Sequence, residues 1–161
     1  MIYPQMSVET KPRKRVRVVA GDVYAVPLDA EHQSFGYLRA YRDVDVAVLP
    51  VLSKGRILSI TQFSTLNSVL DVFLFQDAIR EGRWPRVGNV PFEDDASAWA
   101  PPRKQVAAIR PDVRMVVFQG HFIPAAKFGQ YDNLPEFRRF DENDVIEEIL
   151  RRSGDFLVID S

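Results

Sequence analysis

The chain offers few of the side chains on which catalysis depends. It has two histidines, His32 and His121, and no cysteine. A metal site usually brings several His, Cys, Asp or Glu ligands together, and neither histidine belongs to a motif such as HxH or HExxH. We interpret His32, beside Glu31, as a solvated loop residue and His121, after Gly120, as a turn or edge residue. The sequence therefore predicts no metal ion and no cofactor.

Other reactive groups are equally isolated. A nucleophilic serine needs a sharp turn and a histidine partner, and four serines of the middle region lack a Gly-x-Ser-x-Gly context: Ser53, Ser59, Ser64 and Ser68. Glu93, Asp94 and Asp95 could supply a carboxylate pair, but three adjacent acids in a loop usually repel one another and stay solvated. Neither Gly82 nor Gly88 begins a phosphate-binding loop. We predict no catalytic residue.

A binding surface is better supported, around a tryptophan flanked by arginines. Aromatic and Arg side chains with a charged rim are typical of protein–protein interfaces. Trp84 lies between Arg83 and Arg86, and the acids Glu93, Asp94 and Asp95 follow downstream. These six residues are candidate partner-binding residues. A tryptophan in a rigid bent segment also suits a loop that covers the core, and we favour a core position for Trp84 over an interface position.

A second candidate surface is an acidic helix near the end of the chain. Asp141, Asp144 and Glu148 belong to this predicted helix and are its candidate binding residues. If the partner were a basic nuclease, such an acidic face would speed association and occupy the substrate groove. Helix capping and the helix dipole explain part of the acidity. We therefore favour a solvated helix over a contact surface.

Composition places the chain among ordinary globular proteins. Its 161 residues are 46% hydrophobic, which suffices for one domain with a substantial core. No apolar run is long enough to predict a transmembrane helix, and residues 1–7 lack the pattern of a signal peptide. The absence of cysteine excludes disulfides and is compatible with a reducing compartment. We predict a cytoplasmic protein that does not associate with membranes.

Charge is balanced overall but is uneven along the chain. A net charge of −1 argues against a general nucleic-acid-binding protein. A basic run lies near the start and comprises Lys11, Arg13, Lys14, Arg15 and Arg17. We interpret it as a solvated terminus, because no aromatic side chain is interleaved for base stacking. Residues 1–13, with two prolines among polar residues, are predicted to form a flexible leader.

Short β-like segments dominate the first third of the chain. We predict strands over 16–19, 22–28, 35–41 and 44–52, the last one interrupted by Pro50. Close connections favour an antiparallel meander, with alternate residues of each strand on opposite faces of the sheet. Pro27 lacks an N–H group and should therefore stand at a strand end or edge.

The middle of the chain combines an apolar run with a twice-bent segment. Residues 69–75 are few and rich in β-branched and aromatic types, which favours a buried strand over a helix. A short helix over 76–81 should follow and end at Gly82, which adopts positive φ freely. Gly88 and Asn89 then offer a tight turn.

The last third contains a proline-rich loop, a hairpin and a helix. Residues 96–111 are predicted to cross the surface as a long loop. Residues 113–119 and 121–126 should form a hairpin around Gly120. Asp141 should cap a helix over 142–152 that ends near Gly154. Its predicted apolar face comprises Val145, Ile146, Ile149 and Leu150.

These elements, with a last strand over 156–159, predict an α+β fold. We expect a strongly bent, mostly antiparallel and barrel-like sheet with one long C-terminal helix and a short helix.

Three blocks of sequence follow one another with a specific order and spacing. They are GDVYAVPL at 21–28, FGYLR at 35–39 and AIREGRWPRVGNVP at 78–91. Together they resemble the immunity protein 26 family of bacterial polymorphic toxin systems, over about residues 14–92. The resemblance implies an α+β domain, and we expect residues 14–161 to form a single domain of this kind.

The resemblance also implies a function, which is to bind a partner protein and not to catalyse a reaction. An immunity protein would bind one cognate toxin domain, encoded by a neighbouring gene, and block it stoichiometrically. The naming of the family also includes a small phosphotriesterase, so hydrolysis of phosphotriester (organophosphate) substrates is the alternative. A nucleic-acid-binding module that uses the basic run near the start is a third, weaker hypothesis. The sequence names neither the toxin nor the oligomeric state.

Overall fold

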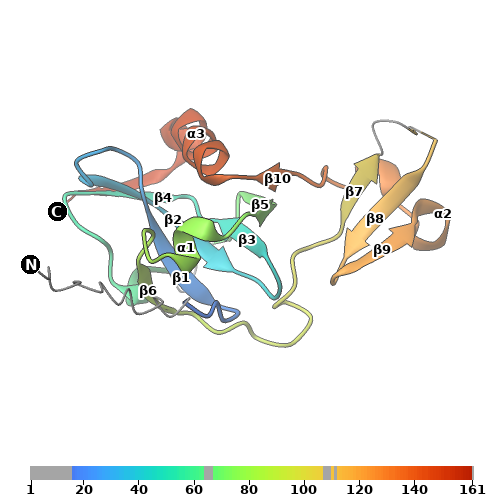
Figure 1. Cartoon of the computed structure of the whole chain (residues 1–161), viewed down its shortest axis with the longest axis horizontal. Helices are drawn as coiled ribbons and strands as arrows, with labels where there is room; N and C mark the ends of the chain where they lie inside the picture. The colour runs from blue at the N-terminus through green and yellow to red at the C-terminus, as the bar shows by residue number, and fades with distance from the viewer. Residues whose placement is uncertain (1–15, 64–66, 107–109, 111, 161) are drawn as a thin grey trace, which may run out of the picture.

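The computed structural model describes residues 16–63, 67–106, 110 and 112–160. It contains an eight-stranded sheet and, to one side of it, a separate three-stranded sheet (Figure 1). The predicted leader, residues 1–13, lies outside the described residues. No helix in the described part of the chain has the length and apolar character needed to cross a bilayer.

The large sheet is built around an antiparallel pair, β1 (Asp22–Pro27) and β2 (Ser34–Ala40). The second half of β2 pairs with β3 (Asp45–Val48), and its first residues pair with β4 (Val51–Lys54). Pro50 stands between β3 and β4, which confirms the predicted interruption. Because two successive strands share one partner, the sheet changes direction along β2.

Four further strands complete the large sheet. They are β5 (Leu70–Leu74), β6 (Arg86–Asn89), β10 (Arg139–Phe140) and β11 (Leu157–Asp160). The hydrogen-bonded order is β10-β5-β3-β2-β1-β6, with β4 attached to β2 and β11 to β4. Only β10–β5 and β11–β4 are parallel among the described pairs. The sheet is therefore mostly antiparallel, as predicted, and it stays open because β6 and β10 do not pair within the described residues.

Both faces of the large sheet are buried, which explains its nearly continuous apolar strands. In β1, Tyr24 and Val26 pack with the helices, whereas Val23 and Ala25 pack on the opposite side. The helices α1 (Asp77–Arg80) and α3 (Glu142–Arg152) share the first core with Trp84. The 3-10 turn η1 (Ile60–Phe63) packs against the second core. The alternation predicted for the first strand is confirmed.

The long helix begins as predicted and ends differently. Asp141 accepts a hydrogen bond from the Asp144 N–H, and the Asp144 carboxylate accepts one from the Asp141 N–H, which forms a capping box. A 3-10 turn, η3 (Ser153–Asp155), follows directly, and Gly154 does not take the positive φ of a C-terminal cap. The predicted glycine cap is therefore wrong, because the chain continues into η3.

The predicted apolar face of α3 is also wrong at one position. Val145 and Ile149 are fully buried, and Ile146 packs against their core. Leu150 is half exposed, whereas Glu148 is buried. Positions 145, 148, 149 and 152 follow the i, i+3, i+4, i+7 spacing of one helix face, so the inward position belongs to Glu148.

The small sheet consists of β7 (Arg103–Val106), β8 (Arg114–Phe118) and β9 (His121–Pro124), paired antiparallel. Gln119 and Gly120 both have positive φ between β8 and β9, as a tight two-residue hairpin turn requires. The predicted hairpin is confirmed. Two short helical turns follow it: α2 (Ala125–Phe128), which contacts β8 and β9, and η2 (Tyr131–Asn133) before β10.

The proline-rich segment 96–111 is only partly the surface loop that the sequence predicts. It contains β7, and Ala98 and Ala100 are buried, the latter in a small core with Tyr41 and Ala47. Arg103 in β7 is 2% exposed and forms an ion pair with Asp45 of the large sheet, at 3.0 Å. This buried pair holds the segment against the large sheet.

Two further local predictions are wrong for physical reasons. Residues 16–19 form no strand, because Val16 donates to the Arg80 carbonyl and Val19 to the Asp22 carboxylate instead of to a neighbouring strand. Gly88 lies in β6 and not in a turn. A Cβ atom at Gly88 would lie 2.8 Å from Ile60 Cγ1, so the glycine permits close packing of η1 on the strand.

Candidate interaction surfaces

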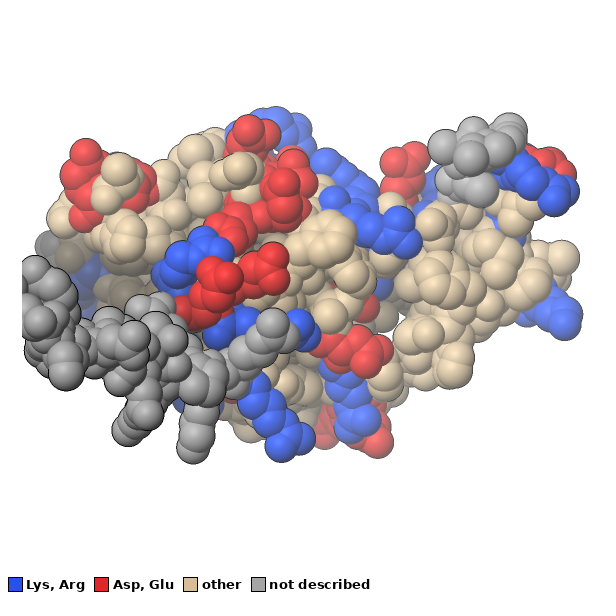
Figure 2. All heavy atoms as spheres, in the orientation of Figure 1, with Lys and Arg blue, Asp and Glu red and all other residues tan. Residues whose placement is uncertain are grey.

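Acidic side chains from two helices line one shallow hollow. Its volume is about 310 Å³, and its lining comprises Phe75, Asp77, Asp141, Glu142 and Asn143. Figure 2 shows acidic side chains gathered over α1 and the N-terminal end of α3. We call the carboxylates of this surface the acidic face, which comprises Asp77, Glu81, Asp141, Glu142 and Asp144. Phe75, at the hollow, is 50% exposed.

Arg83 joins the two halves of the acidic face. Its guanidinium donates two hydrogen bonds to the carboxylate of Glu142 in α3 and one, of 2.8 Å, to Glu81 after α1. Arg80, at the end of α1, adds a second guanidinium, so the five carboxylates of the acidic face outnumber two positive charges and the surface stays negative. The structure brings together three of the predicted binding residues here: Arg83, Asp141 and Asp144.

Glu148, predicted as part of the acidic surface, points elsewhere. Its side chain is buried and is bonded to Arg151 and Arg152, with Arg138 at 3.9 Å. Hydrogen bonds from Arg151 and Arg152 lower the pKa of Glu148 and outweigh the opposite effect of burial. Three guanidinium groups neutralise this carboxylate, so it adds little negative potential to the surface.

The Arg83–Trp84–Arg86 group does not form one patch. Trp84 is 4% exposed and lies in the core beneath the helices, which is the position that the sequence analysis favoured. Arg86, in β6, donates to the buried carboxylate of Asp22 at 2.9 Å. Arg83 and Arg86 therefore belong to separate networks on the two sides of the Trp84 segment.

Asp22 is a key residue that the sequence analysis missed. It is 1% exposed and accepts hydrogen bonds from the Val19 N–H, the Tyr24 hydroxyl, Arg86 and Asn89, at 2.9 to 3.2 Å. Burial alone would raise the pKa of Asp22, but the bonds from Asn89, Val19 and Arg86 outweigh it and hold the pKa below its usual value. A lone acid inside an apolar strand was the available sequence signal.

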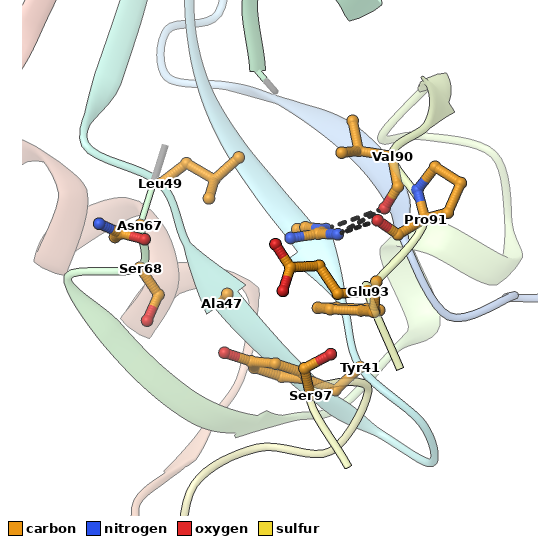
Figure 3. Close-up of a pocket in the computed structure, with 11 residues that line it drawn as sticks. Tyr41, Ala47, Leu49, Asn67, Ser68, Val90, Pro91, Glu93 and Ser97 are labelled. Carbon is orange, nitrogen blue, oxygen red and sulfur yellow. Dashed lines mark hydrogen bonds between the residues drawn. The ribbon is translucent and has the colours of Figure 1, made fainter. Parts of the chain in front are cut away.

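A second, larger cavity lies beside the Glu93–Asp95 loop (Figure 3). One wall is a stack of three side chains. The Arg39 guanidinium lies 3.7 Å from the ring centre of Phe92, and that ring stacks on Tyr41 at 5.5 Å. Arg39 also donates to the carbonyl oxygens of Val90 (2.6 and 3.1 Å) and Pro91 (2.9 Å), the bonds drawn in Figure 3.

The cavity has a volume of about 440 Å³, and Glu93 and Ser97 contribute to its polar lining. The neighbouring acids are engaged elsewhere: Asp94 accepts from the Ser97 N–H at 2.8 Å, and Asp95 pairs with Arg42. The Tyr41 hydroxyl donates to Asp71 at 2.7 Å. Burial and the Asp71 carboxylate raise the pKa of Tyr41, so this phenol stays protonated. These groups suit the binding of a polar ligand.

The histidines take the positions that their sequence context indicates. His32 is an exposed loop residue with positive φ, and His121 is the exposed first residue of β9. Within the described ranges, no three His, Cys, Asp or Glu side chains converge in a way that could hold a metal ion. The geometry of these residues supplies no specific observation in favour of phosphotriester hydrolysis.

The comparisons with known proteins agree with the resemblance carried by the three sequence blocks. A family model described as Immunity protein 26 matches residues 19–109, more than half of the 161 residues. Neither the curated proteins nor the solved structures gave a significant match. Within the matched segment, the bonds of Asp22 and Arg39 tie the three blocks to one another. The chain therefore belongs to the immunity protein 26 family.

Proposed function

We propose that this protein neutralises a bacterial toxin by binding it stoichiometrically, without turnover. Membership of the immunity protein 26 family supports the immunity role. The observation that carries the contact surface is an exposed aromatic ring, Phe75, at a hollow lined by three carboxylates. An aromatic anchor with a charged rim is the usual composition of a tight protein–protein contact.

The anchor is held rigidly, which favours tight binding. Phe75 packs edge-on against Phe73, with ring centres 5.2 Å apart, and Phe73 packs in the same way against Phe137 at 6.1 Å. Bonds from Arg83 likewise fix Glu81 and Glu142. Side chains that are already ordered lose less conformational entropy when a partner binds.

The charge of the surface supports one kind of partner. The three carboxylates at the Phe75 hollow, with the other two of the acidic face, favour a toxin surface that is rich in Lys and Arg, and they would speed its association. A toxin that acts on nucleic acid has such a surface at its active site. We expect the toxin domain to be encoded by a neighbouring gene and to be met in the cytoplasm.

The other predicted binding residues fall outside this contact. Glu93, Asp94 and Asp95 belong to the loop beside the second cavity, Arg86 bonds to Asp22, and Glu148 is buried among arginines. We propose that the toxin contacts Arg83, Asp141 and Asp144 of the predicted set, together with Phe75 and Asp77.

Binding of the purified toxin domain, measured by surface plasmon resonance, tests this proposal. Phe75→Ala should weaken affinity by about 10- to 100-fold, mainly through faster dissociation, as expected for an interface anchor. The double variant Asp77→Lys/Glu81→Lys should slow association by at least about tenfold. Asp155→Lys, an exposed charge reversal in η3, is the control and should bind like the wild type.

Two results would contradict the proposal at different levels. Wild-type affinity in both Phe75→Ala and Asp77→Lys/Glu81→Lys would show that the toxin binds elsewhere. Absence of any complex between the wild-type protein and the toxin domain, with cells left unprotected, would overturn the immunity function itself.

A further inference from the structure

Positive charge is concentrated in the part of the chain that forms the small sheet. Residues 103–139 hold seven basic residues against three acidic ones. The basic residues are Arg103, Lys104, Arg110, Arg114, Lys127, Arg138 and Arg139, and the acidic ones are Asp112, Asp132 and Glu136. The remaining described residues hold ten Lys and Arg against eighteen Asp and Glu. The segment that forms the small sheet and leads into β10 is therefore basic, whereas the rest of the described chain is acidic.

Three of the seven basic side chains already have acidic partners. Arg103 pairs with Asp45 at 3.0 Å, Arg110 with Asp112 at 3.5 Å, and Arg138 lies 3.9 Å from Glu148. In the described part of the chain, four others form no ion pair: Lys104, Arg114, Lys127 and Arg139. Lys104 donates a hydrogen bond to the Asp132 carbonyl at 3.3 Å, but no carboxylate among the described residues neutralises its charge or that of the other three, so all four charges can attract an anionic ligand.

Aromatic rings position three of the four available charges. Lys104 and Arg114 each lie 5.7 Å from the ring centre of Tyr131, and Arg139 lies 5.3 Å from that of Phe137. Lys104 and Arg139 also line one hollow of about 320 Å³, together with Gln105, Glu136 and Phe137. Figure 2 shows basic side chains at the junction between the two sheets, apart from the acidic side chains over α1.

We infer that this hollow is a second binding surface, whose ligand is a carboxylate-rich polypeptide segment. Lys and Arg held at the two sides of a hollow pair directly with Asp and Glu side chains, and the Gln105 amide adds a donor that suits a peptide carbonyl. Three of the five residues that line the hollow, Glu136, Phe137 and Arg139, lie outside the segment that the family model matches. This surface goes beyond the proposed contact of the acidic face.

The geometry favours a polypeptide over a nucleic acid. Single-stranded nucleic acids bind by stacking bases on aromatic rings along a basic track. Here the Tyr131 ring lies under two cations, and Phe137 lies under Arg103 and Arg139, at 5.0 and 5.3 Å. The carboxylate of Glu136 also lines the hollow and repels phosphates and carboxylates alike, so the preference for a polypeptide rests on the ring faces, which these cations already occupy.

Fluorescence anisotropy with a labelled Glu-rich dodecapeptide tests the inference on the full chain without any toxin. If the peptide does not bind, the proposed toxin-binding function is unaffected. If the toxin does not bind, the inference about the basic hollow is equally unaffected. The wild type should bind the peptide at about 50 mM salt and lose affinity as salt screens the charges. Lys104→Glu/Arg139→Glu should weaken binding at least tenfold, and the neutral pair Lys104→Gln/Arg139→Gln should weaken it less.

The matched control is Lys54→Glu/Arg56→Glu, which changes the net charge equally, again at one lysine and one arginine, with exposed residues that do not line the hollow. It should bind the peptide within about twofold of the wild type, and circular dichroism should show that all variants are folded. The inference would be overturned if the peptide did not bind the wild type at low salt. It would also be overturned if both double charge reversals weakened peptide binding equally, or if an oligothymidylate of the same length bound more tightly than the peptide.

Discussion

At the scale of single residues, one buried carboxylate joins two of the three sequence blocks that carry the family resemblance. Asp22 begins β1, and its four hydrogen-bond donors come from three places in the chain: Val19, Tyr24 in the same strand, and Arg86 and Asn89 in β6. A buried carboxylate is tolerated only when its bonds replace those lost to water. The fold therefore requires both the negative charge of Asp22 and the position of its carboxylate among these donors.

Asp22→Asn tests that role by keeping the shape of the side chain and removing its charge. Charge-assisted bonds from Arg86 and a buried acceptor are both weakened, so we expect the free energy of unfolding to fall by about 2–4 kcal/mol. Asp95→Asn removes an exposed partner of Arg42 and should cost less than about 0.5 kcal/mol. Urea unfolding of the two variants makes the comparison. Equal stability of Asp22→Asn and the wild type would contradict the role.

The lowered pKa of Asp22 also predicts the shape of acid unfolding. A carboxylate whose pKa is lower in the folded state stabilises the fold above its ordinary value of about 3.9, and this stabilisation is lost as the pH falls through the lowered value. The pKa of Glu148 is also lowered in the folded protein, so this residue contributes to stability in the same direction. We expect the free energy of unfolding of the wild type to decrease below about pH 4, and the decrease to be shallower in Asp22→Asn. A parallel decrease in both proteins would show that Asp22 is not responsible.

At the scale of elements, the docking of α3 depends on a glycine in a strand of the family segment. A Cβ atom at Gly36, in β2, would lie 2.8 Å from Ile149 Cδ1. The helix therefore packs directly on the strand backbone, and the FGYLR block positions a helix that lies outside the matched segment. The N-terminal end of the same helix carries Asp141, Glu142 and Asp144 of the acidic face.

A double-mutant cycle measures this contact. Gly36→Ala should destabilise the protein by about 1–3 kcal/mol through overpacking, and Ile149→Ala by about 2–5 kcal/mol through a cavity. The double variant should cost clearly less than the sum, because the smaller Ile149 side chain leaves room for the added methyl group. Additive losses in thermal or urea unfolding would show that the two residues do not share a contact.

Elements with a strong local signal were predictable from the sequence, and those set by distant partners were not. The Asp141 cap, the tight turn at Gly120 and the break at Pro50 each follow from local chemistry, and all are confirmed. The strand β7 and the 2% exposure of Arg103 depend on Asp45, more than fifty residues away. The proline-rich composition of residues 96–111 predicted only a surface loop.

The candidate surfaces show the same limit. The sequence indicated Asp141 and Asp144, but it grouped Arg83 with Trp84 and Arg86. Only the fold separates these three residues into an exposed network, the core and the Asp22 network. Phe75 went unnoticed because it continues an apolar strand and carries no local sign that it is exposed.

At the scale of the whole molecule, the basic segment 103–139 is joined to the large sheet by a buried ion pair and by a contact at the surface. Arg103 pairs with Asp45, and the hairpin turn at Gly120 approaches Asp43 and Trp99. We propose that the described residues unfold as one domain, as the sequence analysis expected of residues 14–161. Breaking a buried ion pair by removing one partner costs about 3–5 kcal/mol.

Arg103→Met should therefore separate the unfolding of the two sheets. In the wild type we expect a single calorimetric transition, because the small sheet is held by Asp45 and by residues 135–137, which lead into β10 and whose backbone bonds to Lys104. In the variant we expect the small sheet to melt at a lower temperature than the large one, in a second transition. Two transitions in the wild type would contradict the single domain, and one unchanged transition in the variant would contradict the role of this pair.

Isothermal titration calorimetry of this protein with the toxin domain of the neighbouring gene tests the central claim most directly. We expect a one-to-one complex that prevents toxin activity, weakens as salt rises, and loses about 10- to 100-fold in affinity when Phe75 is replaced by alanine. If no heat of binding is measured while the protein still removes the toxicity, or if Phe75→Ala binds with unchanged affinity, the protein does not act through this surface.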